Sequence, residues 1–282
     1  MASLYLTFPR GMRVPLIRAI PFFAVHLVAI AAFFTPFHWK YVALSLAMYY
    51  IGMFFVTAGY HRYFSHRSFK TSRVFQFVLA FMAQSSAQKG VLWWAAHHRA
   101  HHQYSDTDKD LHSPTLDGFW WSHVGWILSD VNNMTDIARI RDFAKFPELR
   151  FLNKHFLVPP VTLAVAMFLI GGWPALLWGF FISTILLWHG TFCVNSLTHV
   201  FGRQRYKTTD TSRNSFLVAL ITMGEGWHNN HHHYMASTRQ GFFWWEFDPT
   251  YYILKVMSWF RLVWDLRQPP SELLALGPAG DI

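Results

Sequence analysis

Two segments of this sequence carry histidines at a spacing that suits metal binding. In "HHRAHH" (97–102) and in "WHNNHHH" (227–233), three imidazoles occur at the spacing i, i+3, i+4. The two trios are His98, His101 and His102, and His228, His231 and His232. Residues with this spacing lie on one face of a helix, so each trio predicts a helix that presents three imidazoles together. Imidazole nitrogen binds iron, zinc, copper and nickel, and two such faces can meet around metal.

Two further segments can add ligands to the same site. "HRYFSH" contains His61 and His66, and "NSLTH" contains Asn195 and His199. His61 and His66 are five residues apart at the end of an apolar segment, where we expect the helix to fray and release both side chains. Eight or nine imidazoles exceed the ligands that one ion accepts, so the sequence predicts two ions.

The remaining histidines have other predicted roles. His97 and His233 adjoin the trios but point to different helix faces, which favours contacts with the ligands or with solvent over metal binding. Four histidines without a partner at helical spacing are interpreted as structural: His26, His38, His155 and His189. The chain has 17 histidines and only 15 acids, so many imidazoles near apolar surface would lack partners unless a metal satisfied them.

The elements that must position these histidines are those of a membrane protein. Hydrophobic residues make up 52% of the 282 residues and charged residues 14%, against roughly 25% charged in a typical globular domain. The ranges 41–60 and 156–202 contain no Asp, Glu, Lys or Arg, and about 20 such residues cross a bilayer. The predicted fold class is therefore an all-α integral membrane protein. We expect four transmembrane helices in two hairpins, at about 16–36, 41–60, 156–171 and 174–195, with the second hairpin turning at "GGWP".

The histidine segments and both termini are predicted to lie on the cytoplasmic side. Lys40 is the only Lys or Arg on the side of the hairpin turns, so the positive-inside rule places the other side in the cytoplasm. The regions 61–155 and 196–282 then form a cytoplasmic helical cap that holds the metal centre. This topology requires that the segment 74–94 not cross the membrane, and its polar residues favour an interfacial position.

A single domain over residues 1–282 is the simplest organisation, because no internal repeat or low-complexity linker occurs. The N-terminus has no cleavage site after a short apolar core, so we interpret it as mature protein entering its first span. The only cysteine, Cys193, excludes a disulfide within the chain. The net charge of +9 suits a cytoplasmic face near anionic lipid, and no nucleic-acid partner is expected. We expect a multi-pass protein of the bacterial inner membrane or the endoplasmic reticulum.

The histidine segments also carry a resemblance. "HRYFSHRSFK", "HRAHHQYSDTDKDLHSPTLDGFWWSHVGW", "NSLTHVFG" and "GEGWHNNHH" resemble, in order and spacing, the histidine boxes of the stearoyl-CoA type membrane fatty acid desaturases. In that family nine histidines bind two irons. The resemblance assigns this role to His61, His66, His98, His101, His102, His199, His228, His231 and His232. Asn195 matches an asparagine that reaches a metal through water.

The resemblance also implies a reaction. A saturated acyl chain has no acidic proton, no carbonyl near its middle and no leaving group, so a cofactor must start the chemistry. As the resemblance implies, O2 and two electrons are used to remove hydrogens from adjacent carbons, which leaves a cis double bond, at the delta-9 position, and water. No cytochrome b5-like domain or flavin motif follows His233. We therefore expect a separate electron donor, either cytochrome b5-like or of the ferredoxin type.

Two alternatives remain open. A related membrane di-iron hydroxylase, acting on an alkyl chain or a sterol, could use the same centre, because substrate placement decides whether a second hydrogen is lost. A metal transporter or storage protein is the alternative from a different class. Transporters place their ligands near the bilayer midplane, whereas these histidines lie at or beyond the cytoplasmic ends of the predicted spans.

The acyl chain is predicted to occupy a narrow apolar tunnel, kinked at the metals. Tyr49, Met53, Trp94 and Trp188 are the candidate lining residues. Met53 precedes His61 by one to two turns and is bulkier than the small residue that the resemblance implies there. This predicts a preference for palmitoyl-length chains or shorter.

The carrier of the acyl chain stays open at this point. Where animal enzymes of that family have "ARD" before "HRAHH", this chain has Ala95, Ala96 and His97. Where they have a basic pair after "HVGW", this chain has Ser129 and Asp130. The missing charges help to hold CoA phosphates in the animal enzymes, so acyl-CoA, a membrane glycerolipid and acyl carrier protein are all candidate substrates.

Overall fold

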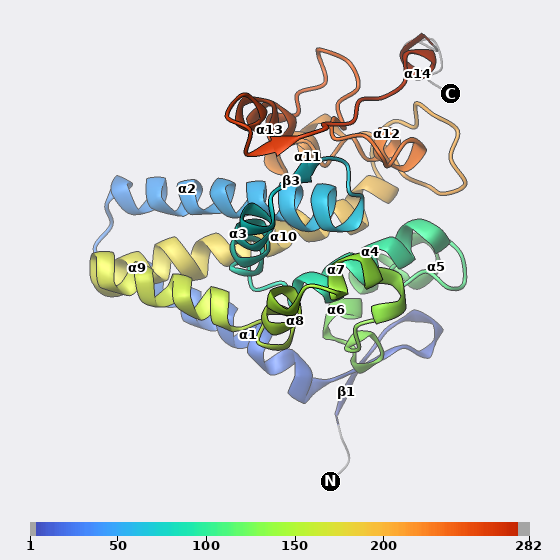
Figure 1. Ribbon diagram of the computed structural model, residues 1–282. Coiled ribbons are helices and arrows are strands. Elements are labelled where there is room, and N and C mark those ends of the chain that lie inside the picture. The colour runs from blue at the N-terminus through green and yellow to red at the C-terminus, as the bar shows by residue number, and fades with distance from the viewer. Residues whose placement is uncertain (1–3, 276–282) are drawn as a thin grey trace.

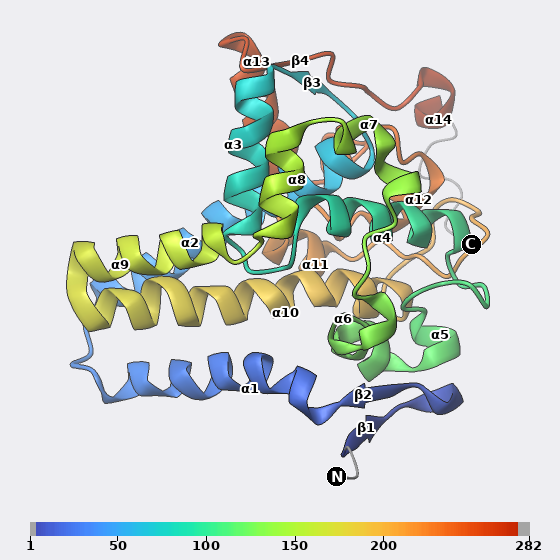
Figure 2. The ribbon, with the colours of Figure 1, turned by 60° about the horizontal axis from the view of Figure 1, so that its bottom comes forward.

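The computed structural model describes residues 4–275, and its long helices lie alongside one another (Figures 1 and 2). The long segments are α1 (Leu16–Ile30) with η2 (Ala31–Phe34), α2 (Trp39–Phe55) with the π-helix η3 (Val56–Ser65), α9 (Val158–Leu176) with the π-helix η7 (Leu177–Ile182), and α10 (Ser183–Ser196) with η8 (Leu197–His199). Three continuous helical stretches of the described chain are long and apolar enough to cross a membrane: Leu16–Phe34, Trp39–Ser65 and Val158–His199.

The third stretch contains a break at the predicted "GGWP" turn. Val158–His199 is 42 residues long, about twice the length that a span needs. Gly171 and Gly172 leave helical geometry, and Gly172 has φ +62° and ψ −155°, a region that only glycine populates readily. The chain reverses there, and α9 and α10 run back alongside each other (Figure 2).

Both hairpin connections lie at the same end of the molecule. The α1–α2 connection and the break within α9 are together at the left of Figure 1, and α4, α5 and α12 lie toward the opposite end. The helices α4 and α12, which carry the two histidine trios, therefore lie at the end opposite the hairpin turns, as the sequence predicted.

Apolar side chains point outward along the long helices. Phe34 is 85% exposed, Leu169 77% and Leu27 69%. A water-soluble protein rarely shows a contiguous apolar surface of this size, so this surface fits contact with lipid.

Shorter elements form the cap at the histidine end. On the N-terminal side these are β1 (Tyr5–Thr7), η1 (Pro9–Gly11), β2 (Arg13–Pro15), β3 (Lys70–Thr71), α3 (Arg73–Gln84), α4 (Val91–Tyr104), α5 (Pro114–Asp117), η4 (Trp121–Gly125), α6 (Trp126–Leu128), η5 (Asp130–Asn132), η6 (Ile137–Ile140), α7 (Arg141–Ala144) and α8 (Pro147–Lys154). On the C-terminal side they are α11 (Phe216–Ile221), α12 (His228–His233), α13 (Pro249–Trp259), β4 (Val263–Trp264) and α14 (Ser271–Ala275). The two antiparallel pairs, β1–β2 and β3–β4, are an addition to the all-α prediction.

The helix α3 is not among the candidate membrane spans, which agrees with the interfacial position predicted for 74–94. Its 12 residues extend only about 18 Å, and Ser72 caps its N-terminus by accepting a hydrogen bond from the Phe75 amide. Gly59 lets α3 approach η3 closely, because a Cβ there would lie 3.1 Å from the Leu79 carbonyl oxygen and 3.3 Å from the Ala83 Cβ. This contact fixes the helix turn that carries His61.

Candidate metal centre

The histidines of the four sequence segments converge into two groups within the described residues. Within each group the potential ligand atoms all lie within 4.8 Å of one another. The first group is His61, His66, His98, His102 and His231, and the second is His101, His199, His228 and His232. Together they contain all nine histidines that the resemblance implied as ligands.

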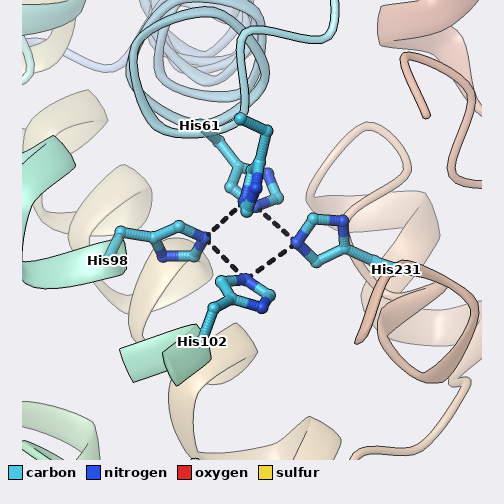
Figure 3. Close-up of side chains that lie close together, drawn as sticks. His61, His98, His102 and His231 are labelled. Atoms are coloured by element: carbon cyan, nitrogen blue, oxygen red, sulfur yellow. Dashed lines mark hydrogen bonds between the residues drawn. The ribbon is translucent and has the colours of Figure 1, made fainter. Parts of the chain in front are cut away.

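In the first group the Nε2 atoms point toward a common centre (Figure 3). His98 Nε2 lies 2.9 Å from His66 Nε2 and 3.0 Å from His102 Nε2. His231 Nε2 lies 3.0 Å from His102 Nε2 and 3.0 Å from His61 Nε2. Each ring therefore directs the same nitrogen at its neighbours, although the rings come from η3, α4 and α12.

Hydrogen bonds among the imidazoles cannot satisfy this arrangement. A neutral imidazole nitrogen either donates one proton or accepts through one lone pair, yet His98, His102 and His231 each face two others through a single Nε2. A central cation does satisfy it. Two nitrogens bound at right angles, each about 2.1 Å from an ion, would be about 3.0 Å apart, which matches the observed spacing.

The protonation state also suits metal binding. Burial, and then the neighbouring imidazoles, lower the pKa values of His66, His98, His102 and His231 well below their usual value. The rings are therefore neutral at physiological pH, with lone pairs available to a metal.

The second group is completed by carboxylates behind the rings. His199 Nε2 lies 3.1 Å from His228 Nε2. On the far side of the rings, His101 Nδ1 lies 2.9 Å from Asp110 Oδ1, and His232 Nδ1 lies 2.6 Å from Asp210 Oδ2. A carboxylate that accepts the Nδ1 proton fixes the tautomer that leaves Nε2 free for a metal.

Two more carboxylates act in the same way. Asp106 Oδ2 lies 3.4 Å from His199 Nδ1, and Glu225 pairs with His61 Nδ1. Burial opposes ionisation of Asp106, but hydrogen bonds, first from His199, hold the pKa of its carboxyl below the usual value. Glu225 also accepts from Arg62, whose guanidinium is fully buried.

Sequence reasoning missed these four acids. Asp106 and Asp110 lie in "SDTDKD" directly after "HRAHHQY", and Glu225 lies in "GEGWHNNHH". A signal was therefore present, since acids are scarce in this chain and these sit inside the histidine segments. Asp210 is far from its partner in the sequence and gave no comparable signal.

The geometry of η3 explains how His61 and His66 face the same way. Five residues of α-helix would place them about 140° apart around the axis. Here the chain forms a π-helix, in which the His66 amide donates to the His61 carbonyl over 3.2 Å, and i to i+5 neighbours share a face. The prediction that both histidines become available by fraying is wrong, because η3 is widened and buried through Ser65, and His66 caps its end while half-buried.

Each histidine trio is divided between the two groups. On α4, His98 and His102 belong to the first group and His101 to the second. On α12 the i, i+4 pair, His228 and His232, belongs to the second group and His231 to the first. The two helices therefore share both ion sites and do not form one site each.

The other predicted residues are placed as follows. Asn195 is half-buried on α10 and lines a cavity together with His98, but it is not a member of either group, so its role through water stays a prediction. His97 stacks on Trp93 with ring centroids 4.2 Å apart, and His233 stacks on Tyr206 at 4.5 Å. Neither belongs to a ligand group, as expected.

Three histidines outside the ligand set are in contact with one another. His26 Nε2 lies 3.1 Å from His189 Nε2, and His189 Nδ1 lies 3.0 Å from His123 Nε2. This supports a structural role for His26 and His189. His112, which had no predicted role, stacks on His101 with centroids 4.2 Å apart and forms a potential ligand group with Asp110.

A cavity of about 760 Å³ adjoins the first group. Trp94, Trp188 and His98 line it, and the prediction that the two tryptophans contact an acyl chain stays a prediction. Tyr49 and Met53 do not line this cavity. They pack against Gly190, where a Cβ would lie 2.7 Å from the Tyr49 hydroxyl and 3.0 Å from the Met53 Cε. The effect of Met53 on chain length stays a prediction.

Comparisons with known proteins agree with this centre. The family model for fatty acid desaturase matches residues 37–258. The chain is 39% identical to the sn-1 stearoyl-lipid 9-desaturase of Synechocystis, covering 90% of this chain and 80% of the relative.

Two plant relatives differ from it in substrate. The chain is 37% identical to the chloroplastic palmitoyl-monogalactosyldiacylglycerol delta-7 desaturase of Arabidopsis thaliana, covering 87% and 67% of the two chains. It is 36% identical to an acyl-CoA 5-desaturase of Anemone leveillei, covering 87% and 77%. The chain therefore belongs to the fatty acid desaturase family, whose members are oxidoreductases.

Proposed function

We propose that this protein is a membrane di-iron desaturase that inserts a cis double bond at the delta-9 position of a saturated acyl chain. The observation that carries the proposal is the convergence of nine histidines into two groups with inward-facing nitrogens. Neutral nitrogen ligands with carboxylates behind them suit iron, and five plus four imidazoles suit a pair of ions.

The bound irons would supply the oxidation of two adjacent carbons, with O2 and two electrons from a separate donor. The protein's own residues hold and enclose the substrate. Phe22, Trp94, Trp188 and Phe192 form apolar walls that exclude water, and His98 lies at the same cavity. A methylene chain in this cavity passes beside the first histidine group.

The delta-9 position is supported by the names of relatives. Three relatives are named 9-desaturases, and others are named delta-7 or 5-desaturases. In this protein the position would depend on how far the acyl chain extends past His98, which lines the cavity.

The proposed topology has four spans, with the histidine end and both termini in the cytoplasm. The break at Gly172 divides the 42-residue helical stretch into two spans. Both hairpin connections then lie on the opposite side of the membrane, where Lys40 is the only basic residue.

The test is expression in a host with a defined fatty acid profile, followed by location of any new double bond by mass spectrometry. The parent should produce a new cis monounsaturated chain, and His98→Ala should reduce it to background. His38→Ala, an exposed histidine at the hairpin end, is the matched control and should retain product. A hydroxylated product, or full activity of His98→Ala, would contradict the proposal.

A further inference from the structure

Some residues that line the cavity beside His98 are also exposed, among them Ile17, Arg18, Asp130 and Leu157, and we take them to mark its mouth. We propose that its substrate is a membrane glycerolipid, whose acyl chain enters sideways from the bilayer between the start of α1 and the turn before α9. This inference rests on the proposed desaturase function and names the carrier of the acyl chain.

The position of the mouth is the first argument. Ile17 on α1 and Leu157 before α9 both line the cavity, and they are 70% and 59% exposed. The candidate spans that contain or follow them begin at Leu16 and Val158. The mouth therefore lies where two spans begin, which is the level of lipid head groups, and its edge is apolar.

Charged and polar groups occupy the other edge of the mouth. Arg18 Nε lies 2.8 Å from Asp130 Oδ1, and Lys89 Nζ donates to Asn133 Oδ1 over 2.6 Å. All four residues line the cavity. Their donors can hold the ester carbonyls and polar head of a lipid, while the chain extends inward.

Side chains around this edge also suit an interface with lipid. Val131 and Met134, next to Asp130 and Asn133, are 81% and 82% exposed. Exposed apolar side chains beside polar ones are typical of protein segments that lie in the head-group region. We therefore expect lipid next to both the apolar and the polar edge of the mouth.

The interior continues this path to the metal ligands. Phe22, Trp188 and Phe192 line the same cavity as His98. An acyl chain can therefore reach the first histidine group without leaving apolar surroundings. The ester that joins this chain to glycerol would stay at the mouth, beside its polar residues.

The charge of the mouth favours a lipid over acyl-CoA. Arg18 and Lys89 supply two positive charges and Asp130 one negative charge, so the net charge is about +1, and Arg18 is already paired. Ala95 and Ala96 on α4 are buried and supply none. A carrier with several phosphate charges would lack counterions here.

Photolabelling of the full-length protein tests the proposal. Vesicles of phosphatidylcholine would carry a trace of the same lipid with a diazirine midway along its acyl chain. After irradiation, peptide mass spectrometry should find adducts on cavity residues such as Phe22, Trp188 or Phe192. Excess unlabelled phosphatidylcholine should reduce these adducts, and stearoyl-CoA should not.

A charged residue at the apolar edge should block entry. Leu157→Arg should lower cavity adducts several-fold, since an arginine at the mouth is unfavourable for a passing methylene chain. Leu217→Arg makes the same change at an exposed position outside the cavity (69% exposed) and should leave the adducts unchanged.

The outcomes separate this inference from the proposed function. Adducts confined to outward-facing residues such as Leu27 or Leu169, or displacement of the label by stearoyl-CoA, would overturn lateral lipid entry. His232→Ala, a ligand that does not line the cavity, should lose desaturation but keep labelling. If the parent were labelled in the cavity and produced no double bond, the desaturase proposal would fail while lipid entry would stand.

Discussion

At the scale of single residues, acidic side chains that contact the histidines are as much a part of the centre as the histidines are. Three aspartates and one glutamate orient His101, His199, His232 and His61 through their Nδ1 atoms. The arrangement explains why so polar a group of residues is stable when buried, since each acid has an imidazole or arginine partner and each of these imidazoles has a fixed tautomer.

Replacing one of these acids tests its role. In Asp210→Asn the amide keeps the shape of the side chain but loses the negative charge that orients His232 and favours a bound cation. We expect metal affinity at the second group to fall about 10- to 100-fold. Iron analysis of purified protein should then show close to one ion per chain after dialysis, against two for the parent.

A surface aspartate supplies the matched control for that experiment. Asp265→Asn removes only an exposed pair with Lys70, so iron content should stay at the parent value. Two ions retained by Asp210→Asn would show that the carboxylate does not support the site.

At the scale of elements, departures from regular α-helix do the positioning. The π-helix η3 brings His61 and His66 to one face. The glycine break within α9 divides a single 42-residue stretch, so that α10 returns to the histidine end and carries Asn195 to the cavity wall. Both departures are local changes in backbone geometry with consequences at the metal centre.

The break gives a prediction about stability. In Gly172→Ala the new Cβ must adopt φ +62°, ψ −155°, at a cost of about 1 to 3 kcal/mol. We expect a lower midpoint of thermal unfolding in detergent. Gly52→Ala is the control, because it lies within helix α2 and meets only the end of the Leu187 side chain. Equal midpoints for the two variants would argue against a required glycine conformation.

At the scale of the whole molecule, one end holds the hairpin turns and the other holds the histidine groups and the cavity mouth. In the proposed topology, this polarity places all candidate metal ligands on one side of the membrane, which is required if they share a centre. It also places the mouth at the surface from which a lipid chain could enter.

Labelling of single cysteines tests this polarity. In a Cys193→Ser background, His38→Cys lies at the hairpin end and Asp108→Cys at the histidine end, and both positions are exposed. A membrane-impermeant maleimide added to intact cells should label His38→Cys only. Asp108→Cys should react after the cells are permeabilised, and its reaction in intact cells would reverse the proposed orientation.

Local patterns in the sequence determined a large part of this protein. Runs without charge predicted the long helices, "GGWP" predicted the break, and the i, i+3, i+4 spacing predicted the two ligand helices. These features depend on residues within a few turns of one another, so backbone geometry and transfer of apolar groups into lipid are sufficient to explain them.

Only the tertiary structure decided how the segments combine. It assigned His231 to the group of His102, 129 residues away, and of His61, 170 residues away. It also paired His232 with Asp210 and separated Met53 from the cavity that Trp188 lines. The physical reason is that spacing fixes the face on which a side chain lies. The partner that this face meets depends on the packing of helices far apart in the chain.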